Sequence, residues 1–336
     1  MPDEKSLNIS REMFNALTGN EQRLRFLVRY AVFAPSSHNK EPWNFTITNN
    51  TIRLIPDLSR ALEISDVEHR QLHISMGVAL ENILIAAAYF GYSTHVTYLI
   101  GSTAGTEDLD IECTEKAPGT AENDTNAARL IEAILRPQIH RGEYKKDLPD
   151  SVLLAELHKM SNDSVRLDII TEPAKRGLVA DLIIQAEIAA LDDPEFQKQL
   201  AHYLKKNTDE PPLGMAAFDK SFLAQLAPLV GNFFNINRFR EKADRALLIE
   251  HTPIFVVIST SQDTPEYWVK AGQMFERFAL EAADHHMSTD PMTAAIQIGE
   301  SSVQLQKILG IPHVRPQFFF RLGYPKGQIT APRAHT

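Results

Sequence analysis

The chain of 336 residues contains a single cysteine, Cys113, so no disulfide bond can form within it. Its first residues, Met-Pro-Asp-Glu-Lys, lack the basic and apolar regions of a secretory signal peptide. No apolar run approaches the roughly 20 residues that a membrane-spanning helix needs. These absences predict a cytoplasmic protein that does not enter a membrane.

Positive charge is also scarce. Lys and Arg number 34 against 43 Asp and Glu, which gives a net charge of −9. A surface with this balance repels phosphate backbones and anionic lipids, so it argues against nucleic acid or a membrane as the main partner. Basic side chains that bind a ligand must therefore be local, and the expected partner is a small molecule.

Several common functional motifs are absent. The run Gly101-Ser-Thr-Ala-Gly105 is not followed by Gly-Lys-Ser/Thr, so it is not a nucleotide phosphate loop. The chain has no Gly-x-Ser-x-Gly nucleophile elbow and no dinucleotide fingerprint. His69 and His73 share one helix face, as metal ligands can, but no third ligand is evident. We therefore predict no metal site, and the commonest type of hydrolase is excluded.

A long-range repeat is present. Residues 77–94 and 272–289, which lie 195 positions apart (272 − 77), share Gly, Glu, two Ala, Ser and Thr in register, and their apolar positions follow helical spacing. We interpret them as two copies of one amphipathic helix, with chance similarity between Ala-rich helices as the alternative. Two copies allow one chain to build internally what other proteins build by dimerising. The Gly-, Thr- and acid-rich stretch 101–125 is the predicted junction between halves at 1–125 and 126–336.

Apolar periodicity, caps and turn residues predict the local structure. The predicted helices cover 20–34, 69–89, 126–135, 149–159, 173–190 and the second repeat copy after Thr264-Pro265, and the predicted strands cover 43–48, 52–55, 165–170, 254–258 and 317–320. Six prolines and glycines break the segment 192–250 into short pieces. We interpret that segment as a surface excursion that could serve as a lid.

One ten-residue segment carries a resemblance to a known family. Ala34-Pro-Ser-Ser-His-Asn-Lys-Glu-Pro-Trp43 resembles the A-P-S-S-x-N-x-Q-P-W signature of the FMN-dependent nitroreductase superfamily. Three later segments resemble its Acg-type branch, in the same order: Asp66 to Gly77, Ile298 to Pro312 and Pro316 to Pro325. In that branch a truncated first half with the signature is fused to a more complete second half, which imitates the usual nitroreductase homodimer.

The resemblance implies an α+β, nitroreductase-like fold of two pseudo-repeated halves, with an antiparallel-rich sheet flanked by helices. It implies a pseudo-dimer within one chain, which would be a monomer or a weak dimer. It also implies an FMN-dependent oxidoreductase that passes two electrons from NAD(P)H through the flavin to a nitroaromatic or quinone-like acceptor. The flavin N5 carries that chemistry, so no catalytic side chain is expected.

The signature loop is the predicted site of the flavin ring. Ser36, Ser37 and Asn39 follow a helix end, where hydroxyl, amide and backbone N–H groups can converge on a polar ring edge. A hydrogen-bonded loop before a strand is the alternative. Glu41 stands where the family has Gln, and its carboxylate would disfavour the anionic reduced flavin unless it points to solvent. Family position adds further flavin contacts: His38, Pro42, Trp43 (whose alternative is a core aromatic) and the backbone N–H groups of Ile298 and Gly299.

A flavin phosphate needs a basic cradle, which the family builds from R-R-T-N-R and an aromatic residue. This chain has Pro137-Gln-Ile-His-Arg-Gly-Glu-Tyr144 instead, where only Arg141 and Tyr144 align. Arg141 can make a charge-assisted bond to phosphate and a protonated His140 can assist, although a solvated loop charge is the alternative for Arg141. Arg333 is a second phosphate candidate, because the family often has a basic residue in this tail.

Two other functions stay open at this point. The chain could bind FMN without turnover and store it beneath the segment 192–250. It could also be a flavin-free interaction scaffold, which the incomplete phosphate cradle favours. The ten-residue signature favours a flavoprotein over the scaffold.

Overall fold

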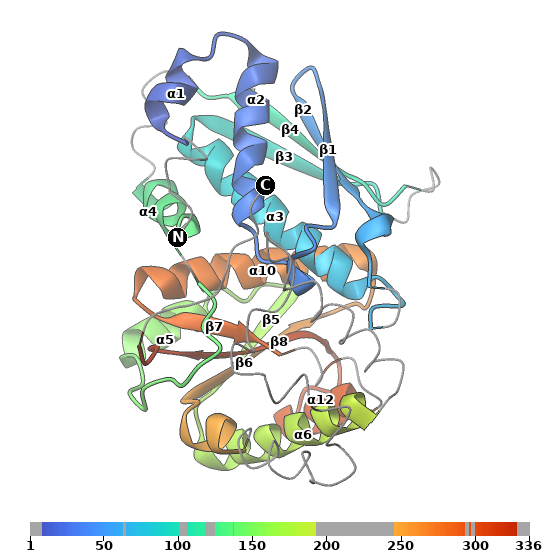
Figure 1. The fold of residues 1–336 in the computed structure, drawn as a ribbon, viewed down its shortest axis with the longest axis vertical. Coiled ribbons are helices and arrows are strands. Elements are labelled where there is room, and N and C mark those ends of the chain that lie inside the picture. Colours follow the sequence, from blue (N-terminus) through green and yellow to red (C-terminus); the bar gives the residue numbers. More distant parts are fainter. Residues whose placement is uncertain are drawn as a thin grey trace, which may run out of the picture.

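The structure is a computed structural model that describes residues 9–62, 65–100, 106–117, 125–136, 138–192, 245–292, 296 and 300–327. These residues form two four-stranded antiparallel sheets. Helices α3 (Arg70–Tyr89) and α10 (Pro265–Asp284) lie between the sheets (Figure 1). The predicted α+β fold of two halves is confirmed, and each half has its own sheet and helices.

The first sheet has the strand order β1-β2-β4-β3. Its strands are β1 (Trp43–Thr48), β2 (Thr51–Pro56), β3 (Tyr92–Tyr98) and β4 (Leu109–Glu115). The predicted hairpin of β1 and β2 is present, and its turn places Asn49 in the left-handed region (φ 54°), which asparagine tolerates. This hairpin fixes the position of the signature loop, because the loop leads directly into β1.

Strand β4 was not predicted, and it lies inside the stretch 101–125 that we predicted as the junction between halves. Its residues Leu109, Ile111 and Cys113 are buried and alternate with more exposed neighbours, as in a strand with one face on the core. The pairing of β4 with both β2 and β3 makes it an inner strand. The boundary between halves at residue 125 stays a prediction.

The second sheet has the order β5-β6-β8-β7. Its strands are β5 (Val165–Ile170), β6 (Ile254–Thr260), β7 (Ser288–Pro291) and β8 (Arg315–Gly323). Every residue of β6 is buried, because α10 covers one face of the sheet while α6 (Pro173–Asp192) and α12 (Ser301–Leu309) cover the other. Burial on both faces explains the continuous apolar run of this strand.

Shorter helices surround this framework. They are α1 (Arg11–Ala16), α2 (Asn20–Val28) with its continuation η2 (Arg29–Phe33), η3 (Ser37–Asn39), η4 (Leu58–Arg60), α4 (Thr125–Ile134), α5 (Ser151–His158) and the π-turn η5 (Ala246–Glu250). Apart from Asp192 at the end of α6 and residues 245–250, the predicted lid 192–250 lies outside the described residues. Its role as a lid stays a prediction.

Helices α3 and α10 are the two repeat copies, and their bounds differ by the predicted offset at both ends (265 − 70 = 195 and 284 − 89 = 195). They cross at two glycines. A Cβ added to Gly77 would lie 2.0 Å from the Val269 carbonyl oxygen, and one added to Gly272 would lie 2.0 Å from the Ile74 carbonyl oxygen. The partners are also 195 apart (269 − 74), so each copy meets the other through the same positions. Such reciprocity is the signature of packing about a two-fold axis.

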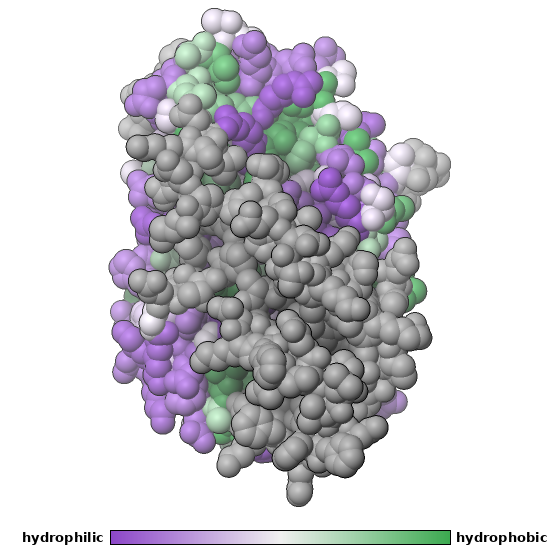
Figure 2. All heavy atoms as spheres, in the orientation of Figure 1, coloured by the Kyte–Doolittle hydropathy of each residue, from purple (hydrophilic) through white to green (hydrophobic). Residues whose placement is uncertain are grey.

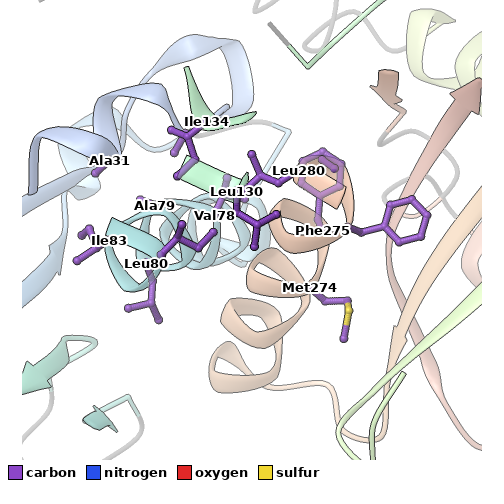
Figure 3. Close-up of a cluster of buried hydrophobic side chains, with 14 of the residues drawn as sticks. Ala31, Val78, Ala79, Leu80, Ile83, Leu130, Ile134, Met274, Phe275 and Leu280 are labelled. Carbon is purple, nitrogen blue, oxygen red and sulfur yellow. The ribbon is translucent and has the colours of Figure 1, made fainter. Parts of the chain in front are cut away.

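The side chains around this crossing form the main core. Helix α4 places Leu130 and Ile134 beside α3 and α10, next to Val78 and Leu280 (Figure 3). On the other side of α10, Phe275 packs against Phe318 and Phe320 of β8. The core is therefore continuous from the first sheet to the second.

Helix α3 corrects one expectation from the sequence. By length and composition it is apolar enough to cross a membrane, although we expected no such run. However, 83% of its apolar window is buried inside the protein. Figure 2 shows hydrophilic residues together with some apolar groups on the described surface, whereas most side chains of α3 are buried. We therefore assign α3 as a core helix.

Candidate functional site

The signature loop joins η2 to β1 through a short, constrained path. Ser36 is extended, η3 forms one tight turn, and Asn39 (φ 58°) and Glu41 (φ 46°) both have left-handed backbone conformations. The Ser36 hydroxyl accepts the Glu41 N–H at 2.9 Å, which holds the turn closed. Two left-handed, non-glycine residues within three positions cost conformational free energy, and backbone strain of this kind is often found at ligand-binding sites.

The loop faces the N-terminus of α3. Ser37 donates from its hydroxyl to Oε1 of Gln71 at 3.5 Å. Asp66 caps the helix by accepting the backbone N–H groups of Gln71 and Leu72, both at 2.9 Å. Burial raises the pKa of Asp66, and the two N–H groups oppose that shift. The capping fixes where the first turn of α3 stands relative to the signature loop.

A narrow crevice with a cavity volume of about 10 Å³ lies between the loop and the helix. Its lining includes Ser37, Pro42, Arg60, Asp66, Gln71 and Ser75. Nε2 of Gln71 is buried in this lining and has no hydrogen-bond partner among the residues that the structure describes. Burying an amide donor without a partner costs about 1 to 3 kcal/mol, which a ligand with an acceptor atom would recover. The crevice is far smaller than typical ligand pockets of about 300 to 1,000 Å³ and has room for about one water-sized group, so a ligand could place no more than a single acceptor atom in it.

Other signature residues have different surroundings. Trp43 is 5% exposed and packs in the core, as the alternative interpretation held. Glu41 is half-buried; burial raises the pKa of its carboxyl group, and nearby Arg60 opposes the shift. Arg60 also donates to the Glu41 carbonyl oxygen at 3.0 Å. The side chain of His38 lies outside the described residues.

A second group of candidate residues lies beside β7 and β8. Ile139 pairs with Thr289 of β7, and the backbone N–H of His140 donates to the Thr289 carbonyl at 2.9 Å. The His140 side chain is buried, and its Nε2 lies 3.1 Å from the Glu143 carbonyl oxygen. A carbonyl only accepts, so Nε2 carries the proton of this bond. Nδ1 then has no partner within the described part of the chain.

A buried arginine of β8 holds this segment in place. Arg321 is 0% exposed; it pairs with Asp290 of β7 and donates to the carbonyl oxygens of Arg141 and Gly142 at 3.2 and 3.3 Å. Its guanidinium also lies over the ring of Tyr144, at 5.1 Å from the centroid. The backbone of the loop is therefore held partly by a buried charge that the sequence analysis did not identify.

The Arg141 side chain itself takes no part in this network. It is exposed, and no ion pair or hydrogen bond involves its guanidinium among the residues described. Tyr144, which aligned with it in the family motif, is buried and donates from its hydroxyl to the His140 carbonyl oxygen at 2.8 Å. Burial raises the pKa of Tyr144 well above its usual value, so this hydroxyl stays a donor. Tyr144 is thus structural, and Arg141 is available to an anion.

The structure does not bring the two groups into direct contact, but β8 connects them. Arg70, next to Gln71, donates to Oε1 of Gln317 at 3.0 Å, and Arg321 holds the Arg141 carbonyl. Gln317 and Arg321 are four residues apart on β8, which corresponds to about 13 Å. Three predicted residues, Ile298, Gly299 and Arg333, lie outside the described residues.

The described residues offer little acid–base or nucleophilic chemistry at these positions. Burial raises the pKa of the Cys113 thiol to about 11, so it is not an activated nucleophile. Nδ1 of His73 is 2.7 Å from the His69 carbonyl oxygen, and burial lowers the pKa of His73. Among the residues described, no group of three or more His, Cys, Asp or Glu could hold a metal ion. The arrangement is suited to binding and orienting a ligand.

Comparison with known proteins gives relatives of similar length, although no family model matches the chain. The putative NAD(P)H nitroreductase Acg of Mycobacterium tuberculosis (strain ATCC 25618 / H37Rv) is 24% identical, with 89% of this chain and 88% of that protein aligned. The probable NAD(P)H nitroreductase PigM of Serratia sp. (strain ATCC 39006) is also 24% identical, with coverages of 93% and 91%. A solved structure of the FMN-dependent nitroreductase NfnB from Mycobacterium smegmatis, in complex with NADPH, matches with a TM-score of 0.40 and 13% identity, over 62% of this chain and 95% of that one.

Proposed function

Because the chain belongs to the FMN-dependent nitroreductase superfamily, in its Acg-type branch, we propose that it is an oxidoreductase that uses bound FMN and NAD(P)H. Its acceptor is a small nitroaromatic or quinone-like molecule. The observation that carries the proposal is the crevice at the signature loop. There Nε2 of Gln71 is buried between the loop and the capped N-terminus of α3, without a hydrogen-bond partner among the described residues. An acceptor atom at the polar edge of a ring could take this hydrogen bond.

The residues present fit FMN in two places. Ser37 and Gln71 can bind the polar edge of the ring, and Ser36 and Asn39 give the loop its shape. At the other end Arg141 offers an exposed guanidinium to the phosphate, and the buried His140, whose Nδ1 has no partner among the described residues, is proposed to assist. We further propose, from family position, that the backbone N–H groups of Ile298 and Gly299 lie near N5, and that Arg333 is a second phosphate ligand.

When bound, FMN would accept a hydride from NAD(P)H and supply two electrons to the acceptor. The protein residues orient the ring and hold its phosphate, and no side chain is assigned to acid–base catalysis. Pro42 and Leu72 supply apolar lining that keeps water from the ring edge. The reciprocal crossing at Gly77 and Gly272 supports a pseudo-dimer within one chain. We propose that it acts in the cytoplasm as a monomer or weak dimer.

The test is spectroscopic. In the absence of oxygen, NAD(P)H should bleach the absorbance of the FMN-loaded protein, and added quinone or nitroaromatic should restore it over many cycles. Dithionite, which reduces flavin directly, is the control. Bleaching by dithionite but not by NAD(P)H would instead indicate a flavin store. If titration produced no quenching of FMN fluorescence, the chain would be a flavin-free scaffold.

The phosphate site can be tested separately. Arg141→Ala should weaken FMN binding about 10- to 150-fold, which corresponds to the roughly 1.5 to 3 kcal/mol of one charge-assisted bond. Lys146→Ala is the matched control, because it removes the same charge from an exposed position of the same segment. Both dissociation constants can be measured by fluorescence quenching. Equal constants for the two variants would move the phosphate site elsewhere, with Arg333 the next candidate.

A further inference from the structure

A pocket with a cavity volume of about 470 Å³ lies beside the second repeat helix. Its volume is within the range of about 300 to 1,000 Å³ that is typical of small-molecule sites. One face of α10 lines it at the spacing i, i+3, i+4, i+7, and Glu81 of α3 and the segment that leads into β5 complete the lining. None of the residues 34–43 is among the described residues that line it, so the pocket is separate from the signature loop.

The symmetry of the two halves explains where the pocket lies. The sheets share one pattern, β1-β2-β4-β3 and β5-β6-β8-β7, so β5 is the counterpart of β1. The signature loop leads into β1, and the segment Met160-Ser-Asn-Asp-Ser164 leads into β5. Ser75 of α3 lines the crevice beside the signature loop, and its repeat partner Lys270 (75 + 195) lines the pocket. Because the segment before β5 lacks the signature and lysine replaces serine, we expect a different ligand here.

The acceptor atoms of the charged lining already have donors. The Glu81 side chain is buried; its Oε1 accepts Nε of Arg277 at 2.6 Å, and its Oε2 accepts Nε2 of Gln273 at 3.2 Å. Oε1 of Gln273 in turn accepts the Tyr98 hydroxyl at 2.7 Å. This network holds the carboxylate in place with its charge compensated, so the ligand does not need to supply a donor to it.

Donors of the lining are left over, by contrast. Nζ of Lys270 donates to Oε1 of Glu266 at 2.6 Å and lies over the rings of Tyr98 and Tyr267, at 5.4 and 4.6 Å from their centroids. Its two other N–H groups make no hydrogen bond to the described residues, and neither does Nη1 of Arg277. Two cations and one carboxylate line the pocket, so its unused capacity favours a ligand that is an anion.

We infer that this pocket binds a small aromatic carboxylate. The ligand carboxylate accepts hydrogen bonds from Lys270, whose countercharge Glu266 lies outside the lining, whereas Arg277 is committed to Glu81. Met160 and Met274 supply the apolar wall, and thioethers make favourable contacts with aromatic rings. The inference goes beyond the proposed function, because it assigns a second ligand to a site that the flavin does not occupy.

The experiment titrates cinnamate and its neutral analogue cinnamamide into the full chain, with and without saturating FMN, by calorimetry. Cinnamate should bind about 10-fold more tightly than cinnamamide, because only the carboxylate makes a charge-assisted bond. Lys270→Met should weaken cinnamate binding about 10-fold and leave cinnamamide binding unchanged. Lys270→Arg keeps the charge and should retain most of the affinity.

Lys307→Met is the matched control, because Lys307 is an exposed lysine of α12 that does not line the pocket. Its affinity for cinnamate should equal that of the wild type. Ser164→Phe fills the pocket from the segment before β5 and should abolish binding of both probes, while thermal melting checks that each variant is folded.

Three results would overturn the inference: equal affinities for cinnamate and cinnamamide, equal cinnamate affinities in the wild type and folded Lys270→Met, or displacement of cinnamate by FMN. None of them bears on whether FMN and NAD(P)H support turnover. Conversely, cinnamate binding that depends on Lys270 in a chain that fails to bind FMN would overturn the proposed function and leave this site standing.

Discussion

Gly77→Ala should destabilise the protein by about 3 to 5 kcal/mol, measured as the free energy of unfolding in urea or guanidinium chloride. Its Cβ would lie 2.0 Å from the Val269 carbonyl oxygen and 3.0 Å from the Gln273 backbone nitrogen. Both neighbours are backbone atoms of α10, so no side-chain rotation can make room. The helices would have to separate along the crossing on which the core is built. We therefore place the cost above the roughly 1 to 3 kcal/mol of ordinary overpacking.

Gly272→Ala should cost a similar amount, because its Cβ would meet the Ile74 carbonyl oxygen at 2.0 Å and Cα of Gly77 at 3.1 Å. The double variant should cost less than the sum of the two. Once α3 and α10 have moved apart to admit one methyl group, the second methyl enters the same gap. Strict additivity in a double-mutant cycle would contradict the reciprocal crossing.

Gly177→Ala is the control for both variants. Gly177 lies within α6, and a Cβ there would meet no atom within 4 Å. Alanine should stabilise the protein by about 0.4 to 1 kcal/mol, because it restricts the unfolded chain without strain in the helix. A loss of stability in all three variants would mean that the glycines share a role unrelated to the close approach of α3 and α10.

Most of the fold could be predicted from local pattern. Strands 43–48 and 165–170 have the predicted bounds, because alternation and turn residues mark both of their ends. The predicted offset of 195 residues between the two repeat copies matches the offset between α3 and α10 at both helix ends. β4 was missed although Leu109, Ile111 and Cys113 alternate, because the surrounding Gly, Thr and acidic residues suggested a linker. Composition averaged over 25 residues conceals a strand of seven.

For the candidate site, the sequence predicted only those residues that follow one another in the chain. Ser36, Ser37 and Asn39 stand together because they follow one another in the chain, whereas the partnership of the loop with Gln71 depends on how α3 packs against it. Trp43 belongs to the core. The local sequence does not show that Gln71 is buried beside the loop or that Trp43 is in the core, since a polar residue at a helix start is ordinarily solvated.

Arg321 shows the same limit more sharply. The strand 317–320 was predicted to be buried, yet the arginine that follows it was not assigned to the interior. A buried charge needs a partner, and its partner Asp290 lies 31 residues away on β7. Periodicity along one strand does not show which residue of another strand will face it. The role of Arg321 therefore became visible only once β7 and β8 were seen to pair.

Arg321→Met should lower the free energy of unfolding by about 3 to 5 kcal/mol, because it leaves the Asp290 carboxylate buried without its countercharge. The carbonyl groups of Arg141 and Gly142 also lose their donor, so the loop should become a faster trypsin site at Arg141. Urea unfolding and limited proteolysis measure the two effects. Arg166→Met is the control: Arg166 pairs with Asp168 at 2.7 Å on the surface of β5, and its loss should cost no more than about 1 kcal/mol.

The double variant Arg321→Met with Asp290→Leu separates stability from positioning. Removing both charges from the interior leaves no buried ion, so most of the lost stability should return. The carbonyl groups of residues 141 and 142 would still lack their donor, and FMN affinity should therefore stay low in the stable double variant. Recovery of affinity together with stability would show that Arg321 contributes to the fold alone. A weak flavin site in a well-folded protein would instead show that this buried guanidinium sets the position of the loop that presents Arg141 to the phosphate.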